Sequence, residues 1–222
     1  MFDCYFYHIR KTGGRAIIYA FMQNSEHRDY LDGGGCHPLY KRLCDSKILN
    51  IQGNTFVCHH KKYIESGNYH FGFSHMPQHG IHFQKPRITI TCIREPVERF
   101  FSYYANMKRE RERFKHSQAK YIDLPFIEFV RRVDRIHLLP TVYMFSKTFN
   151  VDEAFNNLMK VDHILYHDKL DEGLIGLGLT PPPLIGAINN KKFKATQQDL
   201  DELTVLLDPE IKLYEKIMKY RN

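Results

Sequence analysis

The sequence lacks the features that would assign it to a membrane or a secreted class of protein. It contains no run of about 18 uncharged apolar residues, the length that a membrane-spanning helix needs. Its first residues also lack the basic segment followed by an apolar segment that forms a secretory signal. We therefore expect a cytoplasmic protein with no membrane segment. The alternative is the trimmed luminal domain of a larger enzyme.

Cysteine is scarce and shows no pairing pattern. The five cysteines are an odd number, and no two of them form a Cys-x-x-Cys pair. This favours reduced, mostly buried thiols over a framework of disulfides. Cys58, His59 and His60 are adjacent, but neighbouring side chains of a strand point to opposite faces, and no second ligand pair has zinc spacing. We therefore expect no bound metal.

Two familiar phosphate-binding sequences are also absent. The Walker pattern places four residues between a glycine and a Gly-Lys pair, and the dinucleotide fingerprint reads Gly-x-Gly-x-x-Gly. Neither occurs in this chain. A kinase of the Walker type would also need a magnesium-binding Ser or Thr and an Asp in order, which the sequence does not offer. An ATP-dependent kinase is therefore the weaker alternative.

The residues that are present predict an α/β fold in one domain over residues 1–222. A hydrophobic fraction of 43%, with 16 Phe and 14 Tyr, is enough for a substantial core. Strand patterns alternate with helical patterns, which predicts a central parallel sheet flanked by helices. Strands are expected at 4–9, 54–60, 69–77, 87–93 and 163–167. Helices are expected from 14, from 96, at 124–134, 152–160 and 169–178, and at 197–220 with a break near Pro209. Residues 24–53 read mostly as loop.

Positive charge is concentrated in one part of the chain. The formal net charge is +7. Residues 83–120 hold ten Lys or Arg and four Glu, so this stretch accounts for most of the excess. Such a charge indicates an anionic partner, which at this level is a nucleic acid, a nucleotide phosphate or an acidic glycan.

The stretch "HIRKTGGRAI", residues 8–17, joins the first expected strand to the first expected helix. A turn of this kind holds phosphate with the backbone N–H groups of the turn and of the helix N-terminus. Gly13 and Gly14 let the backbone approach an anion without a Cβ. Lys11 adds a full positive charge and Thr12 a hydroxyl. Taken alone, the segment is equally compatible with an ordinary turn.

A second segment, "TCIREPVERFFSYY" at residues 91–104, repeats the order of strand, sharp turn and helix. Pro96 suits the first turn of a helix. Arg94 stands at the end of the strand, where a guanidinium group can bind a phosphate with two hydrogen bonds. Ser102 follows about two helical turns later. Glu98 and Arg99 read as surface or helix-pairing residues.

Together the two segments resemble the nucleotide-binding signature of sulfotransferases that use 3′-phosphoadenosine 5′-phosphosulfate (PAPS). The family pattern "PKTGGTS" is similar to residues 10–16, and "R-[DE]-P-x-x-R-x-x-S-x-Y" is similar to residues 94–104. The likeness is greatest to the Golgi-type carbohydrate sulfotransferases, including the heparan and uronyl 2-O branches. It implies a P-loop-like sulfotransferase fold.

The resemblance also assigns roles to residues. It implies that the first segment binds the 5′-phosphosulfate and the second the 3′-phosphate, with a later basic stretch at 188–194 near the nucleotide. The residues implied are Lys11, Thr12, Gly13, Gly14, Arg15 and Ala16, then Arg94 and Ser102, then Lys191 and Lys192. The chain departs from the family pattern at Arg10, where proline is usual, and at Arg15-Ala16, where Thr-Ser is usual. The second departure removes two hydroxyl donors.

Sulfuryl transfer needs a base for the acceptor proton and a cation near the leaving phosphate. By resemblance Lys11 is the cation, and no metal is required. "FGFSHMPQHGIH" (71–82) is similar to the family's "GH-[FM]-P" segment, which makes His75 the expected base, with His70 and His79 as alternatives. A neutral imidazole with an ordinary pKa near 6.5 suits this task.

We therefore expect a PAPS-dependent sulfotransferase acting on an acceptor hydroxyl, on a carbohydrate in the first instance. An amine or a small natural product is the alternative acceptor, and no nucleic acid partner is expected. An alternative of another class is a non-catalytic module that binds a nucleotide or an anionic glycan. Because Arg15 and Ala16 stand where the family usually has Thr-Ser, a further alternative is a degenerate family member that binds nucleotide without activity.

Overall fold

The structure is a computed structural model that describes residues 3–23, 38–109, 121–183 and 195–221. The chain forms two compact units, and each is described by itself. The first unit comprises residues 1–93 and 159–188, and the second comprises residues 94–158 and 189–222. That residues 1–222 act as a single domain stays a prediction.

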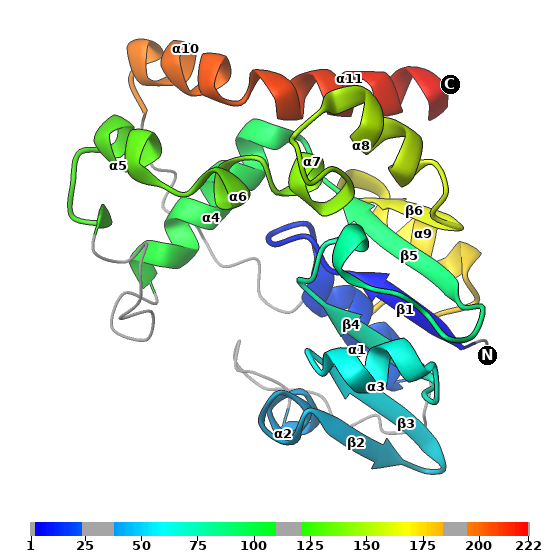
Figure 1. Ribbon diagram of the computed structural model, residues 1–222. Coiled ribbons are helices and arrows are strands. Elements are labelled where there is room, and N and C mark those ends of the chain that lie inside the picture. The colour runs from blue at the N-terminus through cyan, green and yellow to red at the C-terminus, as the bar shows by residue number, and fades with distance from the viewer. Residues whose placement is uncertain (1–2, 24–37, 110–120, 184–194, 222) are drawn as a thin grey trace. The chain divides into compact units, whose positions relative to one another are not determined.

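The first unit is built on a six-stranded sheet (Figure 1). Along the sheet the strands lie in the order β2-β3-β4-β1-β5-β6. All neighbouring pairs are parallel except β2 and β3, which are antiparallel. The strands are β1 (Cys4–Tyr7), β2 (Ile48–Ile51), β3 (Asn54–Cys58), β4 (Phe71–Ser74), β5 (Ile88–Ile93) and β6 (His163–Tyr166).

The strand order makes β1 the point where the direction of winding reverses. After β1 the chain builds β2, β3 and β4 on one side of it, and then β5 and β6 on the other. The carboxyl ends of the five parallel strands share one edge of the sheet. In open α/β sheets ligands bind outside those ends at the point of reversal. The segment that follows β1 therefore occupies the favoured binding position of this fold.

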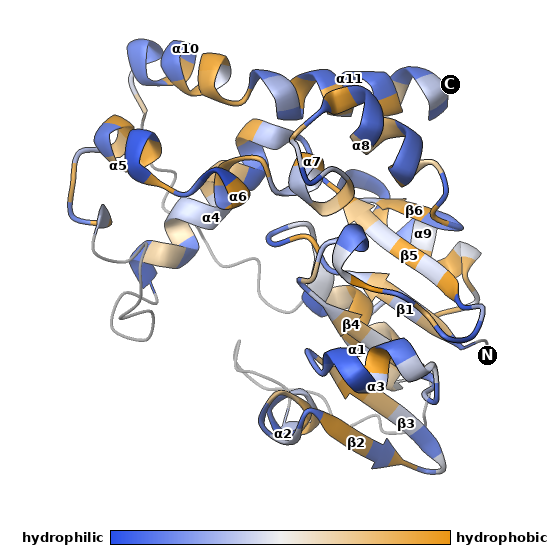
Figure 2. Cartoon of the chain, in the orientation of Figure 1, coloured by the Kyte–Doolittle hydropathy of each residue, from blue (hydrophilic) through white to orange (hydrophobic). Residues whose placement is uncertain are grey.

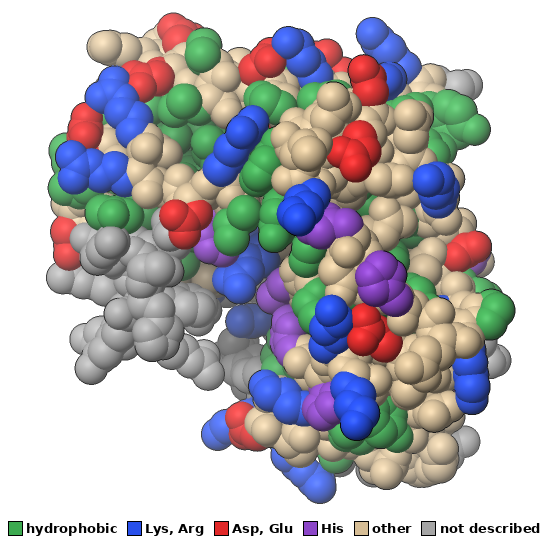
Figure 3. All heavy atoms as spheres, viewed as in Figure 1, with side chains coloured by type: hydrophobic (Ala, Val, Ile, Leu, Met, Phe, Trp, Pro, Cys, Tyr) green, Lys and Arg blue, Asp and Glu red, His purple; other side chains and the backbone are tan. Residues whose placement is uncertain are grey.

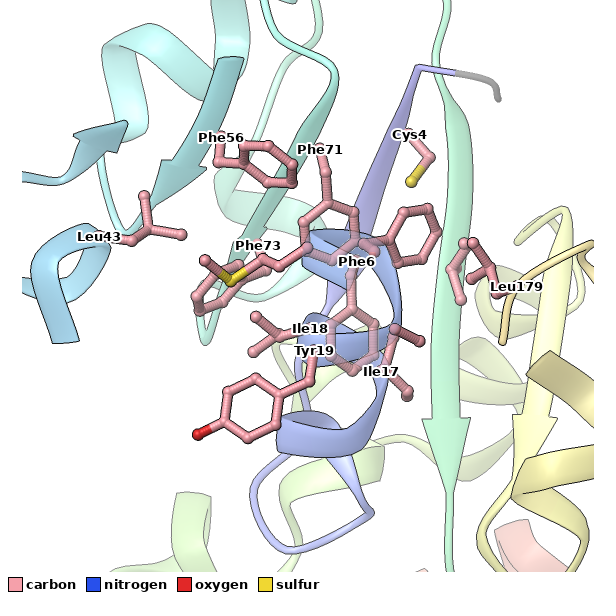
Figure 4. Packing of buried hydrophobic residues seen from close by; sticks show 14 of the residues in the cluster. Cys4, Phe6, Ile17, Ile18, Tyr19, Leu43, Phe56, Phe71, Phe73 and Leu179 are labelled. Atoms are coloured by element: carbon pink, nitrogen blue, oxygen red, sulfur yellow. The ribbon is translucent and has the colours of Figure 1, made fainter. Parts of the chain in front are cut away.

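Alternate residues of the strands point into one core. Cys4 and Phe6 of β1 are buried in the same apolar cluster as Phe71 and Phe73 of β4 (Figure 4). The helix α1 (Gly14–Gln23) covers this face, with the ring of Phe21 stacked on that of Phe71 at a centroid distance of 4.1 Å. In Figure 2 much of β2 and β4 carries the hydrophobic colour. Burial of this face holds the sheet edge in place.

Five further helical segments complete the described part of the first unit. They are α2 (Pro38–Ser46), α3 (Lys61–Ser66), α9 (Leu170–Gly176) and two short 3₁₀ turns, η1 (Gln78–Gly80) and η3 (His167–Lys169). His60 caps α3, because its Nδ1 accepts a hydrogen bond from the backbone N–H of Tyr63. Leu174 of α9 is buried in the same core as β1 and β4.

The second unit is helical in the part that the structure describes. Its helices are α4 (Pro96–Arg109), α5 (Phe126–Arg132), α6 (Arg135–Leu138), α7 (Pro140–Phe145), α8 (Val151–Leu158), α10 (Gln197–Leu206) and α11 (Asp208–Arg221). Aromatic side chains of α4 and α5 form much of its interior, as in the edge-to-face contact of Tyr104 with Phe126 at 5.0 Å. None of the helices in the described residues is long and apolar enough to cross a membrane.

The fold confirms the predicted α/β class and corrects several details. The expected strands and the break in the last helix, between Leu206 and Asp208, are confirmed. In the predicted loop 24–53, the described part contains α2 and β2 and was wrongly interpreted, while residues 24–37 lie outside the described residues. The pairing of β2 makes the sheet mixed rather than wholly parallel. The helices α3, α6 and α7 were not predicted.

Candidate active site

The segment after β1 has the backbone of an anion-binding turn. Lys11 has φ of +70° and Gly13 has φ of +91°. A backbone that alternates right-handed and left-handed residues directs successive N–H groups into one concave surface. The helix α1 starts directly afterwards, with no acidic residue in its first turn. Its N-terminus therefore adds partial positive charge at the same place.

Thr12 locks this turn from inside. Its side chain is fully buried, and its hydroxyl donates a hydrogen bond to the carbonyl oxygen of Ile9 at 2.9 Å. The backbone N–H of Ala16 in turn donates to the carbonyl oxygen of Gly13 at 2.9 Å. The hydroxyl is thus engaged in shaping the turn.

Both glycines of the segment are required by their surroundings. A Cβ on Gly14 would lie 2.0 Å from Nε2 of His8, so a side chain there collides with the imidazole ring. A Cβ on Gly13 would lie 2.9 Å from a methyl group of Leu170, and the left-handed φ of Gly13 is itself unfavourable for other residues. Gly13 keeps the turn open and Gly14 lets His8 pack over the helix start.

Three histidines stand at the carboxyl ends of three adjacent strands. His59, His75 and His8 each directly follow the last residue of β3, β4 and β1. The ring of His75 lies between the other two, with centroids 4.4 Å from His8 and 4.9 Å from His59. On the face shown in Figure 3, histidine side chains lie among lysine and arginine side chains.

The hydrogen bond of His75 defines which nitrogen can act as a base. Nδ1 of His75 lies 2.6 Å from the carbonyl oxygen of His8. A carbonyl can only accept, so Nδ1 must carry the proton. In the neutral ring the lone pair is then on Nε2. The residue that precedes the anion-binding turn thereby orients the imidazole of His75.

Burial keeps the neighbouring imidazoles neutral. Desolvation, helped by His75 and the cationic Arg10 and Lys11, holds the pKa of His8 well below its ordinary value. Its Nδ1 is buried and has no hydrogen-bond partner among the described residues. Desolvation, Lys47 and Arg10 lower the pKa of His59 to about 4. His8 and His59 are therefore uncharged near neutral pH, although they lie in a basic surrounding.

A comparison with protein-family models matches residues 4–177 to the one described as the Sulfotransferase family. The chain belongs to the sulfotransferase family. Members of this family are PAPS-dependent transferases. The match covers β1 to α9 and includes both segments singled out in the sequence. No curated protein matches the chain.

The sulfotransferase fold brings some of the predicted site residues together and places others elsewhere. Residues 11–16 and His75 lie at the carboxyl edge of the sheet. His70, an alternative base, precedes β4 at the opposite edge, with its Nδ1 3.5 Å from a carboxylate oxygen of Asp3. The other alternative, His79, lies in η1. Lys191 and Lys192 lie outside the described residues.

Arg94 and Ser102 belong to the second unit of the sulfotransferase. Arg94 follows the last residue of β5, and its Nη2 lies 3.4 Å from a carboxylate oxygen of Glu98 one helical turn later. Ser102 is half-buried on α4. The interpretation of Glu98 as a helix-pairing residue is confirmed by this ion pair.

Arg99 was wrongly interpreted as a surface or helix-pairing residue. It is 1% exposed, and its Nη2 donates to the carbonyl oxygens of His137 and Leu138 at 3.3 and 2.8 Å. Burial lowers the pKa of its guanidinium group, and the charge of Glu210 opposes this effect. The arginine thus anchors α4 to α6 inside the second unit.

Sequence reasoning missed His8 and His59 as members of the site. The signal that could have found them is positional, since each histidine lies close to the carboxyl end of a predicted strand. His59 was considered only as a zinc ligand. In the described part of the chain, no three His, Cys, Asp or Glu side chains are arranged to hold a metal ion.

Proposed function

We propose that this sulfotransferase moves the sulfuryl group of PAPS to a hydroxyl group of a carbohydrate, with His75 as the base. The observation that carries the proposal is the 2.6 Å contact between Nδ1 of His75 and the carbonyl oxygen of His8. It couples the expected base to the backbone of the anion-binding turn. Such coupling is what a reaction between a phosphosulfate and a nearby hydroxyl requires.

The turn fits the 5′-phosphosulfate end of PAPS. The left-handed Lys11 and Gly13, the acid-free start of α1 and the ammonium group of Lys11 all favour a dense negative charge. Arg15 stands in the first turn of α1 and its side chain is exposed. Its guanidinium charge would take over part of the role of the hydroxyls that the usual Thr-Ser pair provides.

By resemblance, Arg94 and Ser102 bind the 3′-phosphate. A guanidinium group suits a phosphate because its N–H groups match two oxygens at once. The ion pair between Arg94 and Glu98 is partly exposed, so its exchange for a phosphate costs little. Lys191 and Lys192 are further proposed phosphate contacts.

The residues of the first unit supply acid–base and electrostatic assistance. Bound PAPS supplies the sulfuryl group. The Nε2 of His75 takes the proton of the acceptor hydroxyl, while the carbonyl oxygen of His8 holds the proton already on Nδ1 and stabilises the imidazolium form. Lys11 offsets negative charge on the leaving phosphate. No proton transfer needs a metal ion.

A carbohydrate acceptor is supported by the likeness of the two motifs to the glycan branch. The net charge of +7 adds to this support, because acidic glycans are anionic. If the acceptor is instead an amine or a small natural product, that compound should be sulfated faster than the carbohydrates in a panel of candidate acceptors. The non-catalytic alternative predicts nucleotide or glycan binding without transfer.

The first test is calorimetric titration with adenosine 3′,5′-bisphosphate, with ATP and AMP for comparison. We expect preference for the bisphosphate, and loss of binding in Lys11→Ala and in Arg94→Ala. Lys212→Ala and Arg132→Ala are matched controls, because both side chains are more than half exposed, with fractions of 63% and 54%. No binding, or a preference for ATP with magnesium, would contradict the proposal.

The second test separates binding from chemistry. His75→Gln should bind the bisphosphate as the wild type does but transfer labelled sulfate from PAPS at least about 100-fold more slowly. The panel should contain desulfated heparan, a uronic acid polymer, small phenols and amines. Transfer by His75→Gln at the wild-type rate would exclude His75 as the base.

A further inference from the structure

Two cysteine sulfurs meet beside the histidine cluster. Cys44 lies in the last turn of α2, and Cys58 is the last residue of β3. The Sγ of Cys58 donates a hydrogen bond to the Sγ of Cys44 at 3.8 Å. The backbone N–H of Cys58 also donates to the carbonyl oxygen of Lys47 at 2.8 Å, which fixes the end of α2 to the strand.

The surroundings make the two thiols chemically unequal. The hydrogen bond from Cys58, together with one from the hydroxyl of Tyr40 and the charge of Lys47, lowers the pKa of Cys44 to about 6, against the opposing effect of burial. The same contact and burial raise the pKa of Cys58. Cys44 is half-buried and Cys58 fully buried. Cys44 is therefore the nucleophile of the pair and Cys58 the proton donor.

The other described cysteines offer no comparable setting. Cys4 is fully buried, and its burial and the charge of Asp3 raise the pKa of its thiol. Cys92 is fully buried, and its Sγ lies 3.8 Å from the carbonyl oxygen of Ile93. Buried thiols of this kind are inert. Cys36 lies outside the described residues and is removed by substitution in the experiment below.

We propose that Cys44 and Cys58 form a reversible disulfide on exposure to a peroxide, with Cys44 as the attacking thiolate and Cys58 as the resolving thiol. A disulfide bond is about 2.05 Å long, so the sulfurs need to approach by less than about 2 Å. The proposal does not depend on the acceptor or on the identity of the base.

The chemistry balances in two steps. The Cys44 thiolate attacks one oxygen of hydrogen peroxide, so that an S–O bond forms, the O–O bond breaks, and hydroxide leaves and takes up a proton to give water. The Cys58 sulfur then attacks the sulfenic sulfur of Cys44. The S–S bond forms, the S–O bond breaks, and the leaving hydroxide takes the Cys58 proton to give a second water.

The pair is placed where its oxidation would reach the active site. Cys58 directly precedes His59, which has φ of +51°, and the ring of His59 lies 4.9 Å from that of His75. Closing the sulfur–sulfur distance pulls on the strand end that positions His59. The oxidation site is thus one residue away from the histidine cluster.

The test uses the full chain with Cys36→Ser, treated with hydrogen peroxide and mapped by differential alkylation and mass spectrometry. We expect a Cys44–Cys58 linked peptide, which dithiothreitol returns to two free thiols. In Cys58→Ala the disulfide cannot form and the hydrogen bond that lowers the pKa of Cys44 is lost, so a sulfenic acid on Cys44 should be trapped by dimedone at a pH above the ordinary thiol pKa of about 8.5. Cys92→Ser is the matched control and should oxidise like its parent.

A second measurement keeps the proposal falsifiable if a variant folds poorly. The alkylation rate of Cys44 in the parent protein is followed against pH, and its midpoint should lie near pH 6 rather than the ordinary value of about 8.5. A midpoint near the ordinary value would overturn the proposal. So would peroxide treatment that leaves Cys44 unmodified, or that modifies Cys4 and Cys92 equally fast.

Discussion

The contact between His8 and Gly14 makes a testable prediction about the start of α1. Gly14 is the first residue of this helix and does not have the left-handed backbone that only glycine favours. The nearest obstacle to a side chain is therefore the imidazole, whose Nε2 would lie 2.0 Å from the new Cβ. We predict that Gly14→Ala is destabilising in the wild type and harmless once the ring is removed.

The size of this destabilisation follows from the contacts that the His8 ring would lose. To admit a Cβ, His8 has to leave its stack on Phe6, with centroids 5.1 Å apart, and its contact with His75. Overpacking of this kind costs about 3 kcal/mol at its upper range. In a His8→Ala background, Gly14→Ala should instead stabilise by roughly 0.5–1 kcal/mol, the ordinary gain of alanine over glycine in a helix. The coupling energy is then about 3 kcal/mol or more.

The assay is a double-mutant cycle by urea unfolding. The chain has no Trp and 14 Tyr, so far-UV circular dichroism and tyrosine fluorescence are the two probes. Coincident transitions by both probes justify the use of a two-state free energy. A cost for Gly14→Ala that is the same with and without the His8 ring would refute the packing argument, as would a wild-type cost below about 0.5 kcal/mol.

Three further changes have defined outcomes. Glu210→Ala should lower the free energy of unfolding, measured by thermal denaturation, by about 3–5 kcal/mol. The variant removes the carboxylate that accepts from two backbone N–H groups of α7 and that offsets the charge of the buried Arg99. Burial lowers the pKa of His8, so the free energy of unfolding should be unaffected by this residue above about pH 6.5 and should fall below it by at most about 1.4 kcal/mol per pH unit. Urea titrations at several pH values should show that His8→Gln lacks this part of the pH dependence. Thr196→Ala removes a capping box with Asp199 and should cost about 1 kcal/mol in the same titrations, whereas an unchanged midpoint would show that α10 does not need its cap.

Local patterns in the sequence were sufficient for most of the sheet. The runs 4–9 and 87–93 are dense in aromatic or β-branched residues, and both became strands. The missed strand β2 is only four residues long, and its partner β3 follows after the turn Gln52-Gly53, in which both residues have positive φ. Such a turn is normally signalled by Asn-Gly, and here Gln52 stands in place of the Asn, so the hairpin of β2 and β3 was not predicted.

The candidate site also contains residues that local sequence patterns could not identify. Lys11 and His75 were found because their neighbours in sequence carry a motif. His8 and His59 join them only because β3, β4 and β1 lie side by side, and this spatial order cannot be derived from sequence spacing. Arg99 was misjudged for a similar reason, since the carbonyl groups that accept from it are 38 and 39 residues away.

The central position of β1 has a consequence for the order of events during synthesis. Its hydrogen-bonded neighbours come late, with the contacts of His8 to His75 and of Tyr7 to Thr91 spanning 67 and 84 residues. The strand β1, rich in aromatic side chains, is therefore synthesised well before either of its neighbours and stays unpaired until β4 follows. Contacts of such long range slow folding and expose apolar segments to aggregation. The turn after β1 is thus made before the strands that flank it, and it takes its shape only after β4 and β5 have followed.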